Sequence, residues 1–390
     1  MLKLFSFLRN KKDIFGKDNS CIIFAIYSDK IEAFLLKKNK EFSLEFIGAE
    51  AQEGLFSVEN PDMNKLKLNC SKLKVKITEK NLNTKNIIFG VSSEILKPIF
   101  ASKSLKRKNS EKKIKEDEIE KIIFNLHKEF KKKDRTLFLK KAEKYFVDGY
   151  KIENPVGFSG QNLRIDSIGF ESKIDLNKIL NSLSKFLLFE FQGVFALDTV
   201  LLFSEKEFRE VSNAVFINIL SGHISIFLIK KASVSAIDNI DFGYSSFEQK
   251  ISKELSVGIE EARAIKDKFL NGNLDVNLMD KLRNIAFLEA ESILNMVRKS
   301  LLALDQTSLL PKTLFVAFFG KAPLQLEQAF KKGNNWFSDL PFPQDIDIIF
   351  LNSIDMSAII NKRPDLSKIN KAKYIGILVD NILKNINNFK

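Results

Sequence analysis

The residues whose types suit chemistry lie in a short polar turn between two apolar runs at 213–231. The turn contains Asn218, Ser221, Gly222 and His223, so it combines an amide, a hydroxyl, a flexible backbone position and an imidazole. A glycine at such a turn lets backbone N–H groups approach a bound phosphate. The turn has no carboxylate to hold Mg²⁺, which prefers hard oxygen ligands. Asn218 and His223 therefore form either a remodelled ligand site or an ordinary turn amide beside a surface imidazole.

Other catalytic and metal-binding arrangements find little support in the sequence. His127 and His223 are too few for a histidine-rich metal site, and no Ser/His/Asp or Cys/His arrangement is visible. Two cysteines cannot build a disulfide framework or a structural zinc site, and they fit a reducing cytoplasm. Glu260 and Glu261 are adjacent, so they point in different directions and make a poor acid–base pair. We expect neither a catalytic residue set nor a metal site.

The size and charge of the chain limit its class. A chain of 390 residues is long enough for two or more domains. The net charge of +13 favours acidic partners such as nucleic acid or an anionic membrane, although a lysine-rich soluble surface is the ordinary interpretation. Lysine dominates over arginine, and no zinc-finger or aromatic RNA-binding signature is present, so a nucleic-acid partner is not expected. The basic segment 103–115 is either a contact for an anion or a solvated loop.

The spacing of apolar residues predicts strands that alternate with helices, as in α/β proteins. Two apolar runs around residues 28–30 predict an N-terminal hairpin, and a second hairpin spans 213–231. Further strands are expected at 41–50, 85–95, 136–152, 162–170, 312–320 and 345–352. Helices are expected at 119–130, 176–187, 246–270, 276–303 and 369–387, whereas 64–80 fits a helix or a strand and 101–118 a charged loop.

Four stretches carry a resemblance to a known family. The stretch "YKIENPVGFSGQNLRID" at 150–166 contains dense turn chemistry, with one proline and two glycines in "NPVGFSG". The others are the N-terminal hairpin, "NIIFGVSSEIL" at 86–96, and the second hairpin with the segment 240–268 that follows it. In this order they resemble the bacterial cell-division protein FtsA, a relative of actin, from about residue 20 onward.

This resemblance implies an α/β fold of the two-domain actin-like kind, with ribonuclease-H-like subdomains and an inserted FtsA-type subdomain. We expect the inserted subdomain at about 72–152. The remaining units are expected as a tail at 1–16, the first actin-like domain at 17–71 and 153–212, and the second at 213–390 with a helical part at about 244–310.

The residues that would meet a nucleotide depart from the family's pattern. Ala25 and Tyr27 stand where the first phosphate hairpin of the family has an acidic residue and a glycine. The stretch 218–223 replaces an Asp-Ile-Gly-Gly-Gly-Thr pattern, and Phe318 and Phe319 replace a glycine pair near the adenosine. These losses predict a decayed nucleotide cleft that comprises Ala25, Tyr27, Lys30, Asn218, Ser221, Gly222, His223, Lys266, Phe319 and Gly320.

The helix in the 260s departs from the family in one position and keeps another. Arg263 replaces an acidic residue, while Lys266 is retained and either meets a phosphate or is an ordinary solvated lysine. Because bulk replaces bare backbone at three loops, we interpret the chain as a pseudo-ATPase without a cofactor. The alternative is a working actin-like ATPase that binds ATP and Mg²⁺ through unusual phosphate loops.

The resemblance implies a scaffold or adaptor of bacterial cell division. Such a protein links a tubulin-like division filament to the inner face of the membrane, contacts other division proteins and can self-associate. The alternative is a PilM-like cytoplasmic component of type IV pilus assembly, whose inserted subdomain grips a short peptide of an inner-membrane partner. "NPVGFSG" favours the division family over this alternative.

The first twelve residues suggest a contact with an anionic membrane. Leu2, Leu4, Phe5 and Leu8 share one helical face, and Lys11 and Lys12 are among the basic residues beside it. FtsA-like proteins are expected to carry a membrane helix after a C-terminal linker, and no such linker is visible here. The N-terminal segment is therefore a candidate replacement that would place the protein at the inner face of the cell membrane. The ordinary interpretation is a frayed tail.

Overall fold

The computed structural model describes most of the chain between residues 15 and 351. The described residues are 15, 19–38, 42–52, 55–56, 61–80, 84–130, 136–197, 199, 211–231, 233–243, 245–304, 309–318, 324–332, 337–343 and 346–351. The predicted membrane segment 1–12, the predicted helix 369–387, Phe319 and Gly320 lie outside this set. Within it, every helix is too short or too polar to traverse a lipid bilayer.

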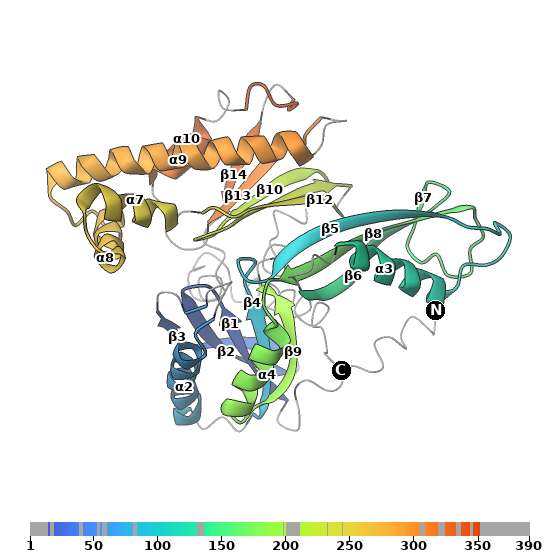
Figure 1. The fold of residues 1–390 in the computed structure, drawn as a ribbon, viewed down its shortest axis with the longest axis horizontal. Helices are drawn as coiled ribbons and strands as arrows, with labels where there is room; N and C mark the ends of the chain where they lie inside the picture. Colours follow the sequence, from blue (N-terminus) through green and yellow to red (C-terminus); the bar gives the residue numbers. More distant parts are fainter. Residues whose placement is uncertain are drawn as a thin grey trace.

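The first sheet has five strands in the order β3-β2-β1-β4-β9 (Figure 1). Three of these strands are antiparallel, and β4 and β9 then add in parallel. Every residue of β1 is buried, which explains why its sequence is an almost unbroken apolar run. The strands are β1 (Ser20–Ile26), β2 (Lys30–Lys38), β3 (Phe42–Ala51), β4 (Asn86–Val91) and β9 (Glu190–Ala196).

Two helices pack on the first sheet, α2 (Met63–Glu79) on β3 and α4 (Leu176–Phe186) on β9. The Asp62 side chain caps α2 by accepting hydrogen bonds from the backbone N–H groups of the first turn. The buried residues of α2 recur at helical spacing, as do Leu176, Leu180 and Leu183 on α4. The stretch 64–80, for which the sequence allowed a helix or a strand, is therefore a helix.

The second sheet repeats the arrangement of the first, in the order β12-β11-β10-β13-β14. Again three strands are antiparallel and two more add in parallel. This duplication matches the two-domain architecture that the family resemblance implies. The strands are β10 (Ala214–Ile219), β11 (Ile224–Lys230), β12 (Ser233–Ile240), β13 (Thr313–Phe318) and β14 (Asp347–Leu351).

A third, antiparallel sheet in the order β5-β8-β6-β7 projects to one side of the molecule, with α3 (Glu116–Phe130) packed against it (Figure 1). It spans Lys97–Ser172, whereas we predicted an inserted unit at about 72–152, and β4 pairs with the first sheet instead. Its strands are β5 (Lys97–Lys106), β6 (Thr136–Val147), β7 (Tyr150–Ile152) and β8 (Asn162–Ser172).

The predicted charged loop at 101–118 is wrong in its first part, because β5 continues to Lys106. Arg107, which follows, is buried and forms a two-pronged contact with Glu118, with N–O distances of 2.7 and 3.2 Å. Its guanidinium also donates to the backbone carbonyls of Gly160 and Lys112. An arginine can satisfy four acceptors in this way because its guanidinium has five donors in a fixed plane. The lysines around it remain exposed.

The remaining helices cover the second sheet and extend beyond it (Figure 1). They are α7 (Ser245–Leu255), α8 (Ile259–Leu270), α9 (Val276–Leu304) and α10 (Leu324–Lys331). The single helix predicted at 246–270 is wrong, because the chain breaks at Ser256, whose φ is +54°. Gly258 then caps α8 with extended backbone. One half of α9 packs on β11 and β12, and the other half forms a small core with α7 and α8.

Candidate functional site

Three segments meet where the two domains join: the tip of the β1–β2 hairpin, the tip of the β10–β11 hairpin, and the chain directly after β4. The backbone N–H of Ser92 donates to the Ile26 carbonyl at 3.0 Å, which fixes the end of β4 beside the first tip. The Ser225 hydroxyl lies 3.5 Å from that of Ser93, which brings β11 to the same place. The two hairpins are thus neighbours of the stretch 86–96, which the sequence analysis noted for its resemblance but not as part of the cleft.

The first hairpin holds a buried carboxylate that sequence reasoning missed. Glu32 pairs with Ala25 in the register of β1 and β2 and is only 2% exposed. It accepts hydrogen bonds from the Tyr27 hydroxyl at 3.3 Å and from Lys30 Nζ at 3.0 Å. The Lys30 ammonium also lies 4.6 Å from the centre of the Tyr27 ring. Lys30 is therefore engaged by its own hairpin, and Tyr27 fills the space beside it.

The second hairpin buries both residues that were candidates for a ligand site. Asn218 and His223 are each 2% exposed, so the predicted surface imidazole is wrong. His223 Nε2 donates to Asn239 Oδ1 at 3.1 Å, and its Nδ1 lies 3.5 Å from Asp241 Oδ1. The Asn218 Oδ1 has no hydrogen-bond partner among the described residues. Ser221, at the tip, accepts a hydrogen bond from the Ser245 backbone through its carbonyl.

Asp241, directly after β12, joins the second domain to the start of the inserted sheet through charge. Its carboxylate forms an ion pair with Lys97, the first residue of β5, and also faces His223. The neighbouring His223 imidazole and the Lys97 ammonium hold the pKa of Asp241 well below its usual range. Asn239 adds a neutral link, because its Nδ2 donates to the Pro98 carbonyl at 2.7 Å. Both links connect the end of β12 to the first two residues of β5.

Glu94 also lies at this junction, and the sequence analysis did not name it as a candidate site residue. It follows β4 in the stretch "VSSEIL" and is 6% exposed. Its Oε1 accepts a hydrogen bond from the Gly222 backbone N–H at 2.7 Å, and its carboxyl group also bonds the Ser28 hydroxyl. Burial raises the pKa of Glu94, while these two hydrogen bonds oppose that rise. One side chain therefore touches both hairpin tips.

The other predicted cleft residues take part in packing within the second domain. Lys266 is not a solvated lysine: its ammonium pairs with the buried Glu248 of α7, and Arg263 pairs with the same carboxylate at 3.1 Å. The Phe318 ring is buried and stacks on Phe350 with ring centres 6.2 Å apart. The FtsA family has a glycine pair here, beside the adenosine. In this chain the first position of that pair holds a packed aromatic side chain.

These groups do not fit a magnesium–triphosphate complex. Lys30, Lys97 and Lys266 each pair with a carboxylate of the protein. The Gly222 N–H, which would otherwise be available to a phosphate, donates to Glu94. A nucleotide would have to displace contacts that the protein makes with itself.

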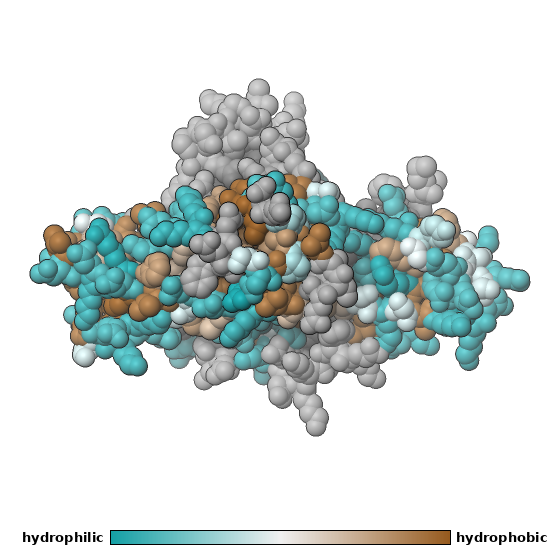
Figure 2. All heavy atoms as spheres, turned by 90° about the horizontal axis from the view of Figure 1, so that it is seen from above, coloured by the Kyte–Doolittle hydropathy of each residue, from teal (hydrophilic) through white to brown (hydrophobic). Residues whose placement is uncertain are grey.

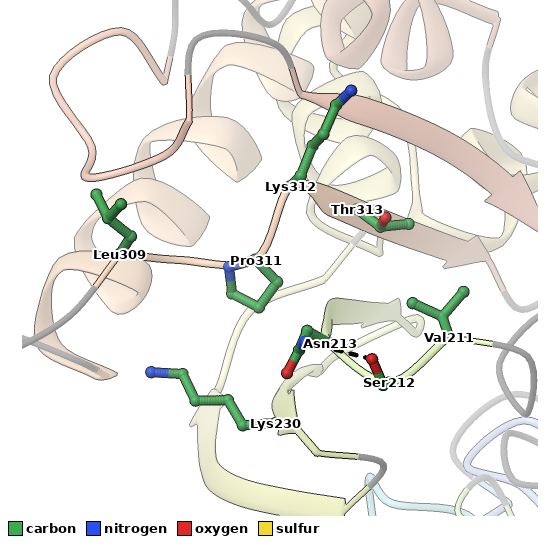
Figure 3. Close-up of a pocket in the computed structure, with 8 residues that line it drawn as sticks. All are labelled: Val211, Ser212, Asn213, Lys230, Leu309, Pro311, Lys312 and Thr313. Atoms are coloured by element: carbon green, nitrogen blue, oxygen red, sulfur yellow. Dashed lines mark hydrogen bonds between the residues drawn. The ribbon is translucent and has the colours of Figure 1, made fainter.

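A separate cavity of about 420 Å³ lies at the other end of the second sheet (Figure 3). It opens beside the starts of β10 and β13, away from the hairpin tip. The Lys312 ammonium lies 3.5 Å from the Asp347 carboxylate, so this cation has a partner. The cavity is lined by Val211, Ser212, Asn213, Lys230, Leu309, Pro311, Lys312 and Thr313.

No protein-family model matches this chain, and no curated protein matches it either. Among solved structures, that of a PilM-PilN type IV pilus biogenesis complex is similar over 93% of this chain and 98% of the other, with 10% identity and a TM-score of 0.64. The ethanolamine utilization protein EutJ of Carboxydothermus hydrogenoformans is similar over 97% and 98%, with 11% identity and a TM-score of 0.47. The latter overlap is too loose to inform function.

The fold that this comparison and the sheet order define is the actin-like ATPase fold. The predicted fold class is therefore confirmed. The two matching sheets, the additional sheet and the helices packed on them contain most of the described residues.

Proposed function

We propose that this chain is a non-catalytic actin-fold adaptor that binds a segment of an inner-membrane protein, as a PilM-like component of type IV pilus assembly would. The observation that carries the proposal is the similarity to a PilM-PilN complex over almost the full length of both chains. An adaptor works by holding partners, so it needs no nucleotide chemistry. The similarity favours this function over the division adaptor that the sequence first suggested.

The groups at the domain junction support the non-catalytic part of the proposal. A nucleotide hairpin must leave backbone N–H groups and cations available for phosphate. Here Glu94 takes the N–H of the second tip, and Glu32 takes the lysine of the first. Binding ATP would require breaking these contacts, and the cost would be subtracted from the affinity.

The end of the inserted sheet supports a partner surface. The turn 155–158 closes with a hydrogen bond from the Phe158 N–H to the Pro155 carbonyl, and Gly157 has a φ of +87°, which suits glycine. This rigid turn exposes Val156 and Phe158 to solvent. We take these two side chains as the apolar part of the partner surface.

The charge around this turn supports a partner with acidic residues. The backbone of Phe158 pairs with Ile114, which brings the basic stretch to its side. Exposed lysines there include Lys106, Lys108, Lys112, Lys113 and Lys115, and the surface at this end in Figure 2 is mainly hydrophilic with apolar atoms between. We therefore place the partner peptide here and expect it to combine an apolar side chain with acidic residues.

The test uses synthetic peptides that cover the cytoplasmic segments of inner-membrane proteins encoded beside this gene. We expect fluorescence anisotropy to show saturable binding of one such peptide. Val156→Asp and Phe158→Asp should each weaken it about tenfold or more, because an apolar anchor is worth at least about 1.4 kcal/mol. Val276→Asp, at a valine on α9 that is more exposed than Val156 (75% against 41%), is the control and should bind normally. Equal affinity of all three variants would refute this placement.

A second candidate is the division adaptor, which the stretch 150–166 favours because of its resemblance to the FtsA family. It would act at the inner face of the membrane and contact a tubulin-like filament. Neighbouring genes separate the two: pilus-assembly genes support the first function, and cell-wall and division genes the second. Co-sedimentation with the polymerised division protein is the direct test of the second.

A further inference from the structure

The contact between Glu94 and the second hairpin crosses from one domain to the other. Glu94 belongs to the segment after β4 of the first sheet, whereas Gly222 is the tip of β10–β11 in the second. The 2.7 Å distance between Oε1 and the Gly222 nitrogen is that of a well-formed hydrogen bond. The Ser28 hydroxyl completes the set from the first hairpin. The carboxyl group thus sits between both tips, where their polar groups converge.

A carboxyl oxygen and a phosphate oxygen are equivalent as hydrogen-bond acceptors. A backbone N–H at a turn between two strands is a common donor to phosphate. In this chain the acceptor comes from the protein itself. We propose that Glu94 is an internal substitute for a bound phosphate: its carboxyl group occupies the anion position at the Gly222 tip and holds the two actin-like domains together without a nucleotide.

The residues on either side of Glu94, as far as the start of β5, also contact the second domain. Ser93 meets Ser225 at 3.5 Å, Lys97 pairs with Asp241, and the Pro98 carbonyl accepts from Asn239 at 2.7 Å. The stretch 93–98 is thus a continuous strap against the second domain. Because the strap is part of the chain, it pays none of the translational entropy that a free ligand pays on binding. A permanent occupant of this kind would leave the domains closed at all times.

The burial of Glu94 argues against an incidental contact. A carboxyl group that is 6% exposed is costly unless it is hydrogen-bonded, and its identified hydrogen-bond donors lie on the two hairpin tips. Opening the domains would break the bond to Gly222. Space is not the reason for the glycine, because a Cβ on Gly222 would meet only the Glu94 Oε1, at 4.0 Å. The specific interaction is the hydrogen bond.

The experiment measures the separation of the domains with spin labels at Thr78→Cys on α2 and Lys268→Cys on α8, both exposed. The native Cys21 and Cys70 are buried, and burial raises the pKa of Cys70 to about 12, so they do not compete for the label. We expect one narrow distance distribution for the wild type, unchanged by ATP and Mg²⁺. Glu94→Gln, which keeps an acceptor oxygen, should match it, as should the surface control Glu120→Ala.

Glu94→Ala is the decisive variant, because it removes the acceptor and leaves the Gly222 N–H without a partner. Its distances should lengthen and broaden. Added formate or inorganic phosphate should restore the wild-type distances in Glu94→Ala. Either anion should also raise the melting midpoint of Glu94→Ala and leave that of the wild type unchanged. A Glu94→Ala protein with wild-type distances, or one that ignores both anions, overturns the proposal.

If Glu94→Ala does not fold, the wild type still decides the matter through hydrogen exchange of the Gly222 amide. Slow exchange of the Gly222 amide without nucleotide supports the closed junction. Exchange of this amide as fast as in a solvent-exposed turn overturns the proposal. The inference does not depend on the partner peptide. A chain that binds no peptide but shows these responses would refute only the adaptor function.

Discussion

Three of the buried glutamates, Glu32, Glu94 and Glu248, differ in the groups that they contact. Glu32 and Glu248 are each paired with cations, from Lys30 in one case and from Lys266 and Arg263 in the other. Glu94 instead has neutral donors, and burial raises its pKa. A cation stabilises the ionised form of a carboxyl group, whereas neutral donors in a buried site compensate only part of the lost hydration. The pKa of Glu94 is therefore raised above its usual value.

This difference predicts a pH dependence that Glu94→Gln removes. Glu94 releases its proton near pH 4.5 in the unfolded chain and at a higher pH in the folded one. Between these values the folded state binds more protons, so stability from this residue falls as pH rises. The wild type should gain stability relative to Glu94→Gln as pH falls through the raised pKa of Glu94 towards 4.5, by up to about 1.4 kcal/mol per pH unit.

Urea denaturation of both proteins at several pH values measures this difference. Asp29 and His223 also face Glu94, but they are present in both proteins, as is Asp241 with its lowered pKa, so their direct contributions largely cancel. A difference that stays constant with pH would mean that Glu94 titrates normally.

For single residues, the sequence predicted where the site residues lie better than it predicted which groups they contact. Ala25, Tyr27, Gly222 and His223 do lie at the two hairpin tips, because local patterning determines where a strand ends. Glu94 was not predicted, because its role depends on a residue 128 positions away in the chain. Its only signal was a polar stretch after a buried strand.

At the scale of elements, the tip of the second hairpin is supported by the chain that follows β12. A Cβ on Gly243 would lie 2.3 Å from the carbonyl oxygens of Leu220 and Ser221. Both are backbone atoms, so neither can rotate away. The tip and the segment at 241–243 therefore have to move apart if this glycine gains a side chain.

Gly243→Ala should consequently lower the free energy of unfolding by about 1–3 kcal/mol, as overpacked sites do. It should also speed hydrogen exchange at the Gly222 amide. Gly258→Ala, where a Cβ meets nothing within 4 Å, is the control and should cost less than about 1 kcal/mol as an N-cap change. Equal denaturation midpoints for the two variants would show that the tip tolerates displacement.

Most elements could be predicted from periodicity, and the failures have physical causes. The break at Ser256 was missed because the residues on both sides keep helical spacing, with Phe247, Ile251 and Phe269 in one small core. The extension of β5 to Lys106 was missed because its outer half is polar. A strand that is exposed on one face needs no apolar alternation to be held in register by its neighbour β8.

At the scale of the whole molecule, two copies of one sheet arrangement face each other across a junction that the protein fills with its own groups. Enzymes of this general architecture need a space between domains for the nucleotide. Here the strap 93–98 occupies part of that junction, and the inserted sheet projects from its end. We expect the partner surface to be available permanently, so peptide affinity should be the same with and without ATP. A change in affinity on adding ATP would contradict this.

The central claim is that carboxyl groups of the protein take the place of a bound nucleotide, and calorimetric titration of the purified chain with ATP and Mg²⁺ tests it most directly. We predict no saturable heat up to millimolar nucleotide. Saturable binding with a micromolar Kd would contradict the claim, because it would mean that Glu94 yields the Gly222 tip to phosphate.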